Sequence, residues 1–316
     1  MTSIFEVSKT PSHKQKKKDE GRYVGPIEKI PNMKNDFIRH IFNVKRQREI
    51  LHGNKEFTSL LTSITNISKH DATHLSIRDI CSNKFLSYVY ALSCNVPVPK
   101  IYHYGKLSDY SKVPNECVIK FDKGQDGINV LCLRNGENIY REQRELAWAT
   151  LDDVDRDTPV IIEELLENKY NSDEYYGPEQ KNIHGIIDYK IFAFNGVGEF
   201  LSIIMRDNER EIIKSYWYDL RNNIALTDNF NYELFPSKRE IETMKHYCRS
   251  LRFSKSFFVR IDFYITTEGI LFGEFTLRPG NFYKGWRINK LNKNILELFS
   301  ERMEINQIPA PPPPTY

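Results

Sequence analysis

The fold is decided by residues 257–277, which read FFVRIDFYI-TTEG-ILFGEFTL. Two runs rich in β-branched and aromatic residues flank the turn at Thr266–Gly269, a pattern typical of a β-hairpin. Because side chains alternate in direction along a strand, Arg260, Asp262 and Tyr264 share one face. A turn centred near residue 268 sets Glu274 opposite Asp262, to within one residue.

Two carboxylates then face each other across a strand pair, with Thr276 and Arg278 on the same face as Glu274. Like charges in this position destabilise a sheet unless a cation lies between them. That cation is either a structural partner, such as Arg260 or Arg278, or a divalent metal ion. Ligands that are all oxygen favour Mg²⁺ over zinc, and Mg²⁺ held by one or two carboxylates usually accompanies phosphate.

Candidate phosphate-binding residues lie earlier in the chain. Lys120 stands on the short apolar run 117–121, directly before a loop that contains Gly124 and Gly127. These glycines would let backbone N–H groups approach a phosphate, although a turn with an exposed lysine fits the same residues. Asp188 and Lys190 share a strand face, either as an ordinary ion pair or as a further cation for phosphate. A P-loop is excluded and a Rossmann site has no support, because neither glycine motif occurs.

Short strands and helices alternate through the middle of the chain. Asn195-Gly196 is a strong hairpin signal, and Ser237 with Glu240 forms a capping box that opens a helix. Antiparallel hairpins mixed with helices predict an α+β architecture rather than a doubly wound sheet. We expect helices over about 83–94 with Ser82 as N-cap, 141–150, from 237 onward and about 288–302, and strands over 117–121, about 129–133, 158–166, 187–194, 199–205, 257–265 and 270–277.

Composition describes an ordinary globular chain of 316 residues, with 45 Lys and Arg against 42 Asp and Glu and a net charge of +3. Lysines cluster in the polar arm 1–30, but no aromatic residues are interleaved with them, so nucleic acid is not an expected partner. The five cysteines form no CxxC pair, which favours a reducing compartment. No run approaches the roughly 18 apolar residues of a membrane span. We therefore expect a cytoplasmic protein.

An ordered set of motifs over about residues 80–285 resembles the ATP-grasp superfamily and, within it, the TupA-like branch associated with teichuronopeptide and other surface-polysaccharide synthesis. The matching pieces are Ser82-Asn83-Lys84 with Val96-Pro97-Val98-Pro99, Cys117 to Gly127, Val160 to Leu166, Asp188 to Gly196, and Arg260 to Tyr264 with Phe272 to Thr276.

The sequence departs from the family pattern at a few positions. Asn83 stands where Asp is more usual, and Thr276 stands where many ATP-grasp enzymes have Asn. The run Arg278-Pro279-Gly280-Asn281 also differs from the small residues of the branch. None of these changes removes a charged metal ligand or a phosphate cation, so we expect an active enzyme.

The resemblance implies ATP and Mg²⁺ as cofactors, and it implies a role for each matching residue. Lys84 and Lys120 would contact the phosphates, with the loop from Gly124 to Gly127 closing over them. Glu163, Glu164, Leu165 and Leu166 would bind adenine, mainly through backbone groups, and Glu167 would meet the ribose hydroxyls. Asp262 and Glu274 would hold Mg²⁺, Lys190 would touch the γ-phosphate or the acceptor, and Arg278 would stabilise the transferring phosphoryl group.

The same resemblance implies an ATP-grasp fold, in which two α+β subdomains clamp ATP. We place a basic arm at 1–30, a helical extension at 31–105, a lid subdomain at 106–166, a C-terminal subdomain at 167–305 and a Pro-rich tail at 306–316. The implied activity is ATP-dependent ligation of a carboxylate to an amine through an acyl phosphate, adding an amino acid to a uronic acid or peptide of a surface glycan. A phosphotransferase acting on a hydroxyl and a non-catalytic nucleotide-binding scaffold are the alternatives.

Overall fold

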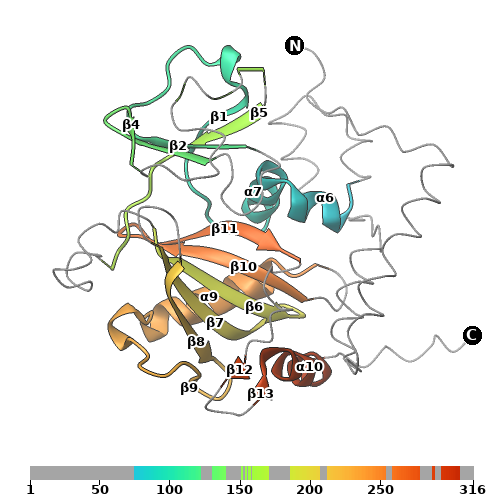
Figure 1. The fold of residues 1–316 in the computed structure, drawn as a ribbon. Helices are drawn as coiled ribbons and strands as arrows, with labels where there is room; N and C mark the ends of the chain where they lie inside the picture. Colours follow the sequence, from blue (N-terminus) through green and yellow to red (C-terminus); the bar gives the residue numbers. More distant parts are fainter. Residues whose placement is uncertain are drawn as a thin grey trace, which may run out of the picture.

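Two antiparallel sheets and a few helices make up the described part of the chain (Figure 1). A computed structural model describes residues 75–121, 130–139, 151, 154, 156–157, 159–170, 186–206, 212–253, 258–277, 287–288 and 293–306. The expected α+β class is therefore confirmed. No helix among these residues is long and apolar enough to cross a membrane.

The smaller sheet has the strand order β1-β5-β2-β3-β4. One face packs into a core of its own that contains Ile119, Leu131 and Ile162, and the other face carries Lys120 and Glu163. Its strands are β1 (Ile101–Lys106), followed by the 3₁₀ turn η1 (Leu107–Asp109), then β2 (Cys117–Phe121), β3 (Val130–Arg134), β4 (Glu137–Asn138) and β5 (Pro159–Glu163).

The larger sheet has the order β11-β10-β6-β7-β8-β9. Its β6–β7 hairpin turns at Asn195 and Gly196, which have φ of 52° and 79°, as the Asn-Gly pair predicts. Its strands are β6 (Asp188–Phe194), β7 (Val197–Arg206), β8 (Ile212–Asp219), β9 (Ile224–Ala225), β10 (Phe258–Ile265) and β11 (Ile270–Thr276), and a separate pair consists of β12 (Arg287–Ile288) and β13 (Lys293–Asn294).

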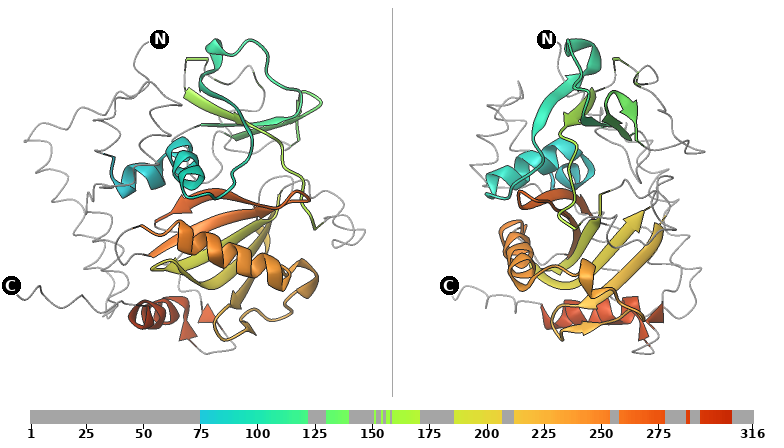
Figure 2. Two further views of the ribbon diagram at one scale, coloured as in Figure 1. Left: turned by 180° about the vertical axis from the view of Figure 1, so that it is seen from behind. Right: turned by 90° about the vertical axis from the view of Figure 1, so that its left-hand side faces the viewer.

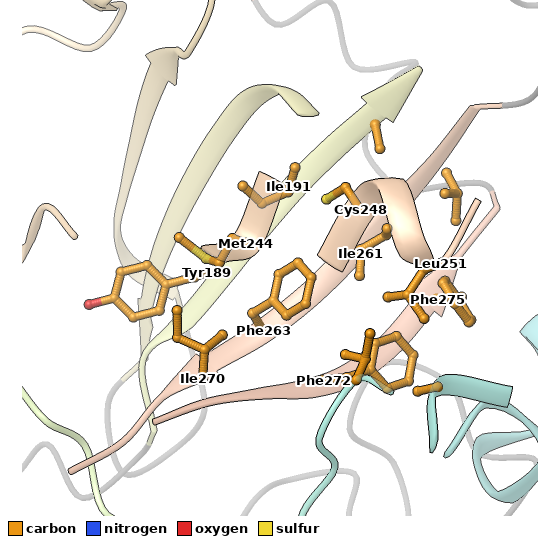
Figure 3. Close-up of a cluster of buried hydrophobic side chains, with 14 of the residues drawn as sticks. Tyr189, Ile191, Met244, Cys248, Leu251, Ile261, Phe263, Ile270, Phe272 and Phe275 are labelled. Carbon is orange, nitrogen blue, oxygen red and sulfur yellow. The ribbon is translucent and has the colours of Figure 1, made fainter. Parts of the chain in front are cut away.

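Helix α9 (Lys238–Ser250) covers one face of this sheet and α10 (Ile295–Ile305) covers part of the other (Figure 2). Met244 and Cys248 of α9 lie over sheet residues that include Ile261 and Phe263 (Figure 3). On the opposite face, Phe299 of α10 joins a cluster of phenylalanines from β6, β7 and β10. Because side chains alternate in direction along each strand, the two faces of the large sheet contribute to two separate hydrophobic cores. A 3₁₀ turn, η4 (Tyr232–Leu234), precedes α9.

Helix α7 (Lys84–Ser93), which follows α6 (Ile77–Ser82), packs between the two sheets, and its Phe85 stacks on Tyr104 of β1. Tyr90 of α7 packs near Phe275 of β11, and Ile161 of β5 belongs to the same buried cluster as α7 and the large sheet. Figure 1 shows α7 beside β11 and below the small sheet. The two sheets therefore share one hydrophobic core through α7.

Several sequence expectations hold and others need correction. The Ser237–Glu240 capping box and the strands of the two hairpins are confirmed. Asn83, not Ser82, caps α7, because its side chain accepts the Leu86 amide while Ser82 donates to the Asp79 carbonyl.

The last helix begins at Ile295 instead of 288. The strand expected at 158–166 ends at Glu163, and β8, β9 and α6 were not anticipated. The helix expected at 141–150 lies outside the described residues, as does the arm 1–30.

A buried ion network ties α10 to the sheet. Arg302 donates to Asp219 at 2.7 Å and its Nε lies 3.5 Å from Glu199, whose side chain is 1% exposed. Arg221 and Asn306 also donate to Glu199. Removing one partner from such a network leaves a buried charge without compensation.

We expect Arg302→Met to lower the free energy of unfolding by about 3 kcal/mol, because Asp219 then stays buried without the guanidinium that donates to it and Glu199 loses a nearby positive charge. Urea denaturation followed by circular dichroism measures this. The control is Glu304→Gln on the exposed side of the same helix, which should change stability by less than about 0.5 kcal/mol. Equal stability of the two variants would show that the network does not hold α10.

Candidate functional site

The predicted carboxylate pair lies on the hairpin of β10 and β11. Asp262 pairs with Glu274 across the two strands. This register depends on a bulge, since Phe263 pairs with Phe272 and Gly273 is left as the extra residue. A Cβ at Gly273 would lie 2.9 Å from the Tyr264 ring, so only glycine fits there. The bulge turns Glu274 onto the same face as Asp262.

Arg260 bridges the two carboxylates. Its guanidinium donates to Asp262 Oδ1 at 2.6 Å and Oδ2 at 2.8 Å, and to Glu274 Oε1 at 3.1 Å. Lys190, on the neighbouring strand β6, also binds Asp262 and lies 3.2 Å from Asp188. Burial opposes ionisation of Asp262, but Arg260 and Lys190 outweigh it and hold its pKa below the usual value. Asp262 is therefore an anion at neutral pH.

A second group of polar side chains lies on the inner face of the small sheet. Lys120 of β2 forms an ion pair with Glu163 of β5, and both side chains are almost wholly buried. Tyr88 of α7 donates to Glu163 at 2.8 Å and lies 3.4 Å from the Lys120 ammonium. Burial acts to lower the pKa of Lys120, but Glu163 and Tyr264 raise it, so the lysine keeps its charge.

Two contacts join these groups into one site. Lys120 lies 5.9 Å from the ring centroid of Tyr264, which follows Asp262 on β10. Lys84, at the start of α7, lies 3.7 Å from Glu274. Cations from α7, β6 and β10 thus converge on carboxylates of β10 and β11, and the Lys120–Glu163 pair of the small sheet lies next to them at Tyr264.

The other residues predicted to bind the nucleotide follow β5. The Glu164 carboxylate accepts the Lys100 amide at 2.7 Å, and Leu165 and Leu166 are half-buried while Glu167 is exposed. Glu163 still belongs to the sheet, where it pairs with Val118, and its side chain is engaged with Lys120. The structure brings together Lys84, Lys120, Glu163, Lys190, Asp262 and Glu274, whereas Gly124, Gly127 and Arg278 lie outside the described residues.

Sequence reasoning missed Tyr88 and Tyr264 as members of the site and treated Arg260 only as a possible structural partner. Tyr88 lies four residues after Lys84 on one helix, and this spacing places both on the same side. Arg260 and Tyr264 alternate with Asp262 on one strand, so a search along that face would have found them.

The donor set suits Mg²⁺ in type, since Asp262 and Glu274 offer carboxylate oxygens and the Glu274 side chain is 36% exposed. No group of three or more His, Cys, Asp and Glu side chains that could hold a metal occurs among the residues that the structure describes. A pair of carboxylates is nevertheless enough for Mg²⁺ that arrives with phosphates as further ligands.

Comparison with solved structures returns ATP-grasp ligases. D-alanine–D-alanine ligase from Helicobacter pylori is 15% identical, with a TM-score of 0.41, and the match covers 80% of this chain and 66% of that one. L-amino acid ligase from Bacillus licheniformis is 13% identical, with a TM-score of 0.42, over 75% of this chain and 52% of that one. The chain therefore spans between about half and two thirds of these proteins. No curated protein matches it.

A family model described as TupA-like ATPgrasp matches residues 64–298, well over half of the chain. The match includes the whole constellation from Lys84 to Glu274. This protein belongs to the TupA-like ATP-grasp family and has the ATP-grasp fold.

Proposed function

We propose that the protein is an ATP-dependent carboxylate–amine ligase. The observation that carries this proposal is the convergence of Lys84, Lys190 and Arg260 on the facing carboxylates Asp262 and Glu274, with Lys120 beside them over the Tyr264 ring. Phosphoryl transfer needs cations around the transferred group and a pair of metal-binding carboxylates, with little covalent participation by the protein.

In the proposed reaction a substrate carboxylate oxygen attacks the γ-phosphorus of ATP, the bond to the β-phosphate oxygen breaks, and ADP leaves. The amine nitrogen then attacks the acyl carbon, the bond from that carbon to the phosphate oxygen breaks, and phosphate leaves while the nitrogen loses a proton. Mg²⁺ held by Asp262 and Glu274 would supply positive charge next to the phosphates.

The cations of the site have defined tasks in this scheme. Lys120 and Lys84 bind the phosphates of ATP, and Lys190 lies close enough to Asp262 to contact the transferred group or the acceptor. Arg260 and Lys190, which hold Asp262 in this structure, would turn to phosphate oxygens in the loaded site, because phosphate offers the cations new anionic partners. Arg278, beyond the described residues, remains a proposed stabiliser of the phosphoryl group.

Further parts of the proposal rest on the family resemblance. The segment Glu163–Glu167 binds the nucleoside, and the loop with Gly124 and Gly127 closes over the phosphates. We propose that the small sheet forms the lid subdomain and the large sheet the C-terminal one. The family resemblance also leads us to propose that the enzyme adds an amino acid to a uronic acid or peptide of a surface glycan and that it acts in the cytoplasm.

We expect Asp262→Asn and Glu274→Gln each to lower the rate of ADP release at least about 100-fold, because each removes one of the two anionic metal ligands. A coupled assay with Mg²⁺-ATP and an active acceptor pair measures this rate. Glu268→Gln in the exposed turn of the same hairpin is the control and should act as wild type. Normal turnover in both site variants would eliminate the metal assignment.

Lys120 provides a second test. We expect the double variant Lys120→Met/Glu163→Gln to bind Mg²⁺-ATP at least about tenfold more weakly, because a phosphate cation is lost. Changing both partners avoids leaving a buried charge unpaired. Titration calorimetry gives the dissociation constant, and Lys106→Met with Asp157→Asn, an exposed ion pair of the same sheet, is the matched control. Unchanged binding would leave Lys120 with a structural role only.

Isotope transfer separates a ligase from a phosphotransferase. With a carboxylate substrate labelled with ¹⁸O, we expect one labelled oxygen in the released phosphate, because the acyl phosphate breaks between carbon and oxygen. Mass spectrometry of the phosphate measures this. Consumption of the acceptor with all label retained in the product carboxylate would identify transfer to a hydroxyl instead.

A further inference from the structure

The chain crosses from the small sheet to the large one through residues 164–167. The crossing is held at its first end by Glu164, whose amide donates to the Lys100 carbonyl at 3.0 Å and whose carboxylate accepts the Lys100 amide. At its second end Asn168 forms a β-bridge with Thr266, and the Lys169 amide donates to the Ile265 carbonyl at 3.0 Å. Three residues, 165–167, lie between these points and span the two sheets.

Side chains at the second end reach helix α9. Lys169 donates to Glu240 Oε1 at 2.7 Å and Tyr170 donates to Glu240 Oε2 at 2.8 Å. The Glu240 side chain is 12% exposed, whereas Lys169 keeps 46% of its side chain exposed. We call the contacts of Lys169 and Tyr170 with Glu240 the latch.

Glu240 has a separate task in its own helix. Its carboxylate accepts the Ser237 amide and hydroxyl, both at 2.7 Å, and so completes the capping box of α9. Burial acts to raise the pKa of Glu240, but donation from Lys169, Ser237 and Tyr170 lowers it to about 2. The carboxylate is therefore ionised at neutral pH and accepts all of these hydrogen bonds at once.

Helix α9, which carries Glu240, is packed firmly on the large sheet. Met244 and Cys248, one and two turns further along α9, are almost completely buried against the large sheet (Figure 3). Tyr170 also packs against Tyr189 of β6, with ring centroids 6.3 Å apart. The latch thus fixes the end of the crossing to the same core that carries Asp262.

We propose that Glu240 is a positioning residue for the nucleotide: by holding Lys169 and Tyr170 on α9, it fixes the path of residues 164–167. This inference rests on the proposed function, in which this segment binds the nucleoside. A segment held firmly at both ends loses little conformational freedom when it binds a ligand, whereas one whose second end is held by backbone contacts alone must be ordered further at the expense of affinity.

The two tasks of Glu240 can be separated by mutation. Lys169→Met/Tyr170→Phe removes the latch and leaves the capping box intact. Ser237→Ala weakens the capping box and leaves the latch intact. Lys245→Met removes an exposed ion pair with Glu242 on the same helix and controls for the loss of a lysine. The single variant Lys169→Arg, in which Tyr170 is unchanged, keeps the charge and a hydrogen-bond donor. It should therefore behave as the wild-type protein.

Two measurements on the full chain test the proposal. Titration calorimetry with Mg²⁺-ATP should give a dissociation constant about tenfold higher for the latch variant, and wild-type values for Ser237→Ala and Lys245→Met. Thermal unfolding should rank these variants in the opposite order, because Ser237→Ala should lower the melting temperature more than the latch variant does. Hydrogen exchange without nucleotide should be faster at residues 164–167 in the latch variant alone.

The outcomes distinguish this inference from the proposed function. Faster exchange together with weaker binding in the latch variant supports the inference. Unchanged exchange at residues 164–167, or wild-type affinity in the latch variant, overturns it. Absence of Mg²⁺-ATP binding by the wild-type protein overturns the proposed function and, with it, the role of the latch in positioning a nucleotide, even if exchange responds as expected.

Discussion

The structure depends on the pairing of Asp262 with Glu274 across β10 and β11. Two carboxylates on one face of a strand pair repel each other, so the surroundings must supply positive charge. Arg260 supplies it from the same strand, Lys190 from β6 and Lys84 from α7. Each cation comes from a different element, so this pair is neutralised only when β6, β10 and α7 pack around it. The same set of charges is suited to a metal ion and phosphates, which would exchange partners with them.

Two kinds of connection hold the small sheet over this centre. The apolar connection is α7, whose side chains share a core with β11 and with Ile161 of the small sheet. The polar connection is the contact of Lys120 and Glu163 with Tyr88 and Tyr264. Burial makes the polar connection specific, because a buried lysine or glutamate without its oppositely charged partner would lower the stability of the fold. The crossing at residues 164–167 adds a covalent connection, which meets the large sheet where Asn168 bridges Thr266 and where the latch contacts α9.

Much of this fold is predictable from local sequence. The Asn195-Gly196 turn and the Ser237–Glu240 capping box act over four residues or fewer, and both form as expected. The final helix begins later than expected because the pair β12 and β13 precedes it. Strand β8 was missed, although it pairs with β7 along its length. The bulge at Gly273 can be recognised in the sequence. Apolar residues are two apart at Ile270 and Phe272, but the next one, Phe275, comes three residues later, as an extra residue in the strand requires.

By itself, the sequence determined which residues carry charge on which strand face, because alternation and turn chemistry are local properties of the chain. It thereby determined the pair Asp262 and Glu274 and placed Lys120 and Lys190 on strands. Only the tertiary structure decided which cation meets which carboxylate, because these contacts join residues far apart in the chain: Lys84 with Glu274, Lys120 with Glu163, and Lys169 with Glu240. Partner choice between distant charges depends on how sheets and helices pack, and packing is a property of the whole chain.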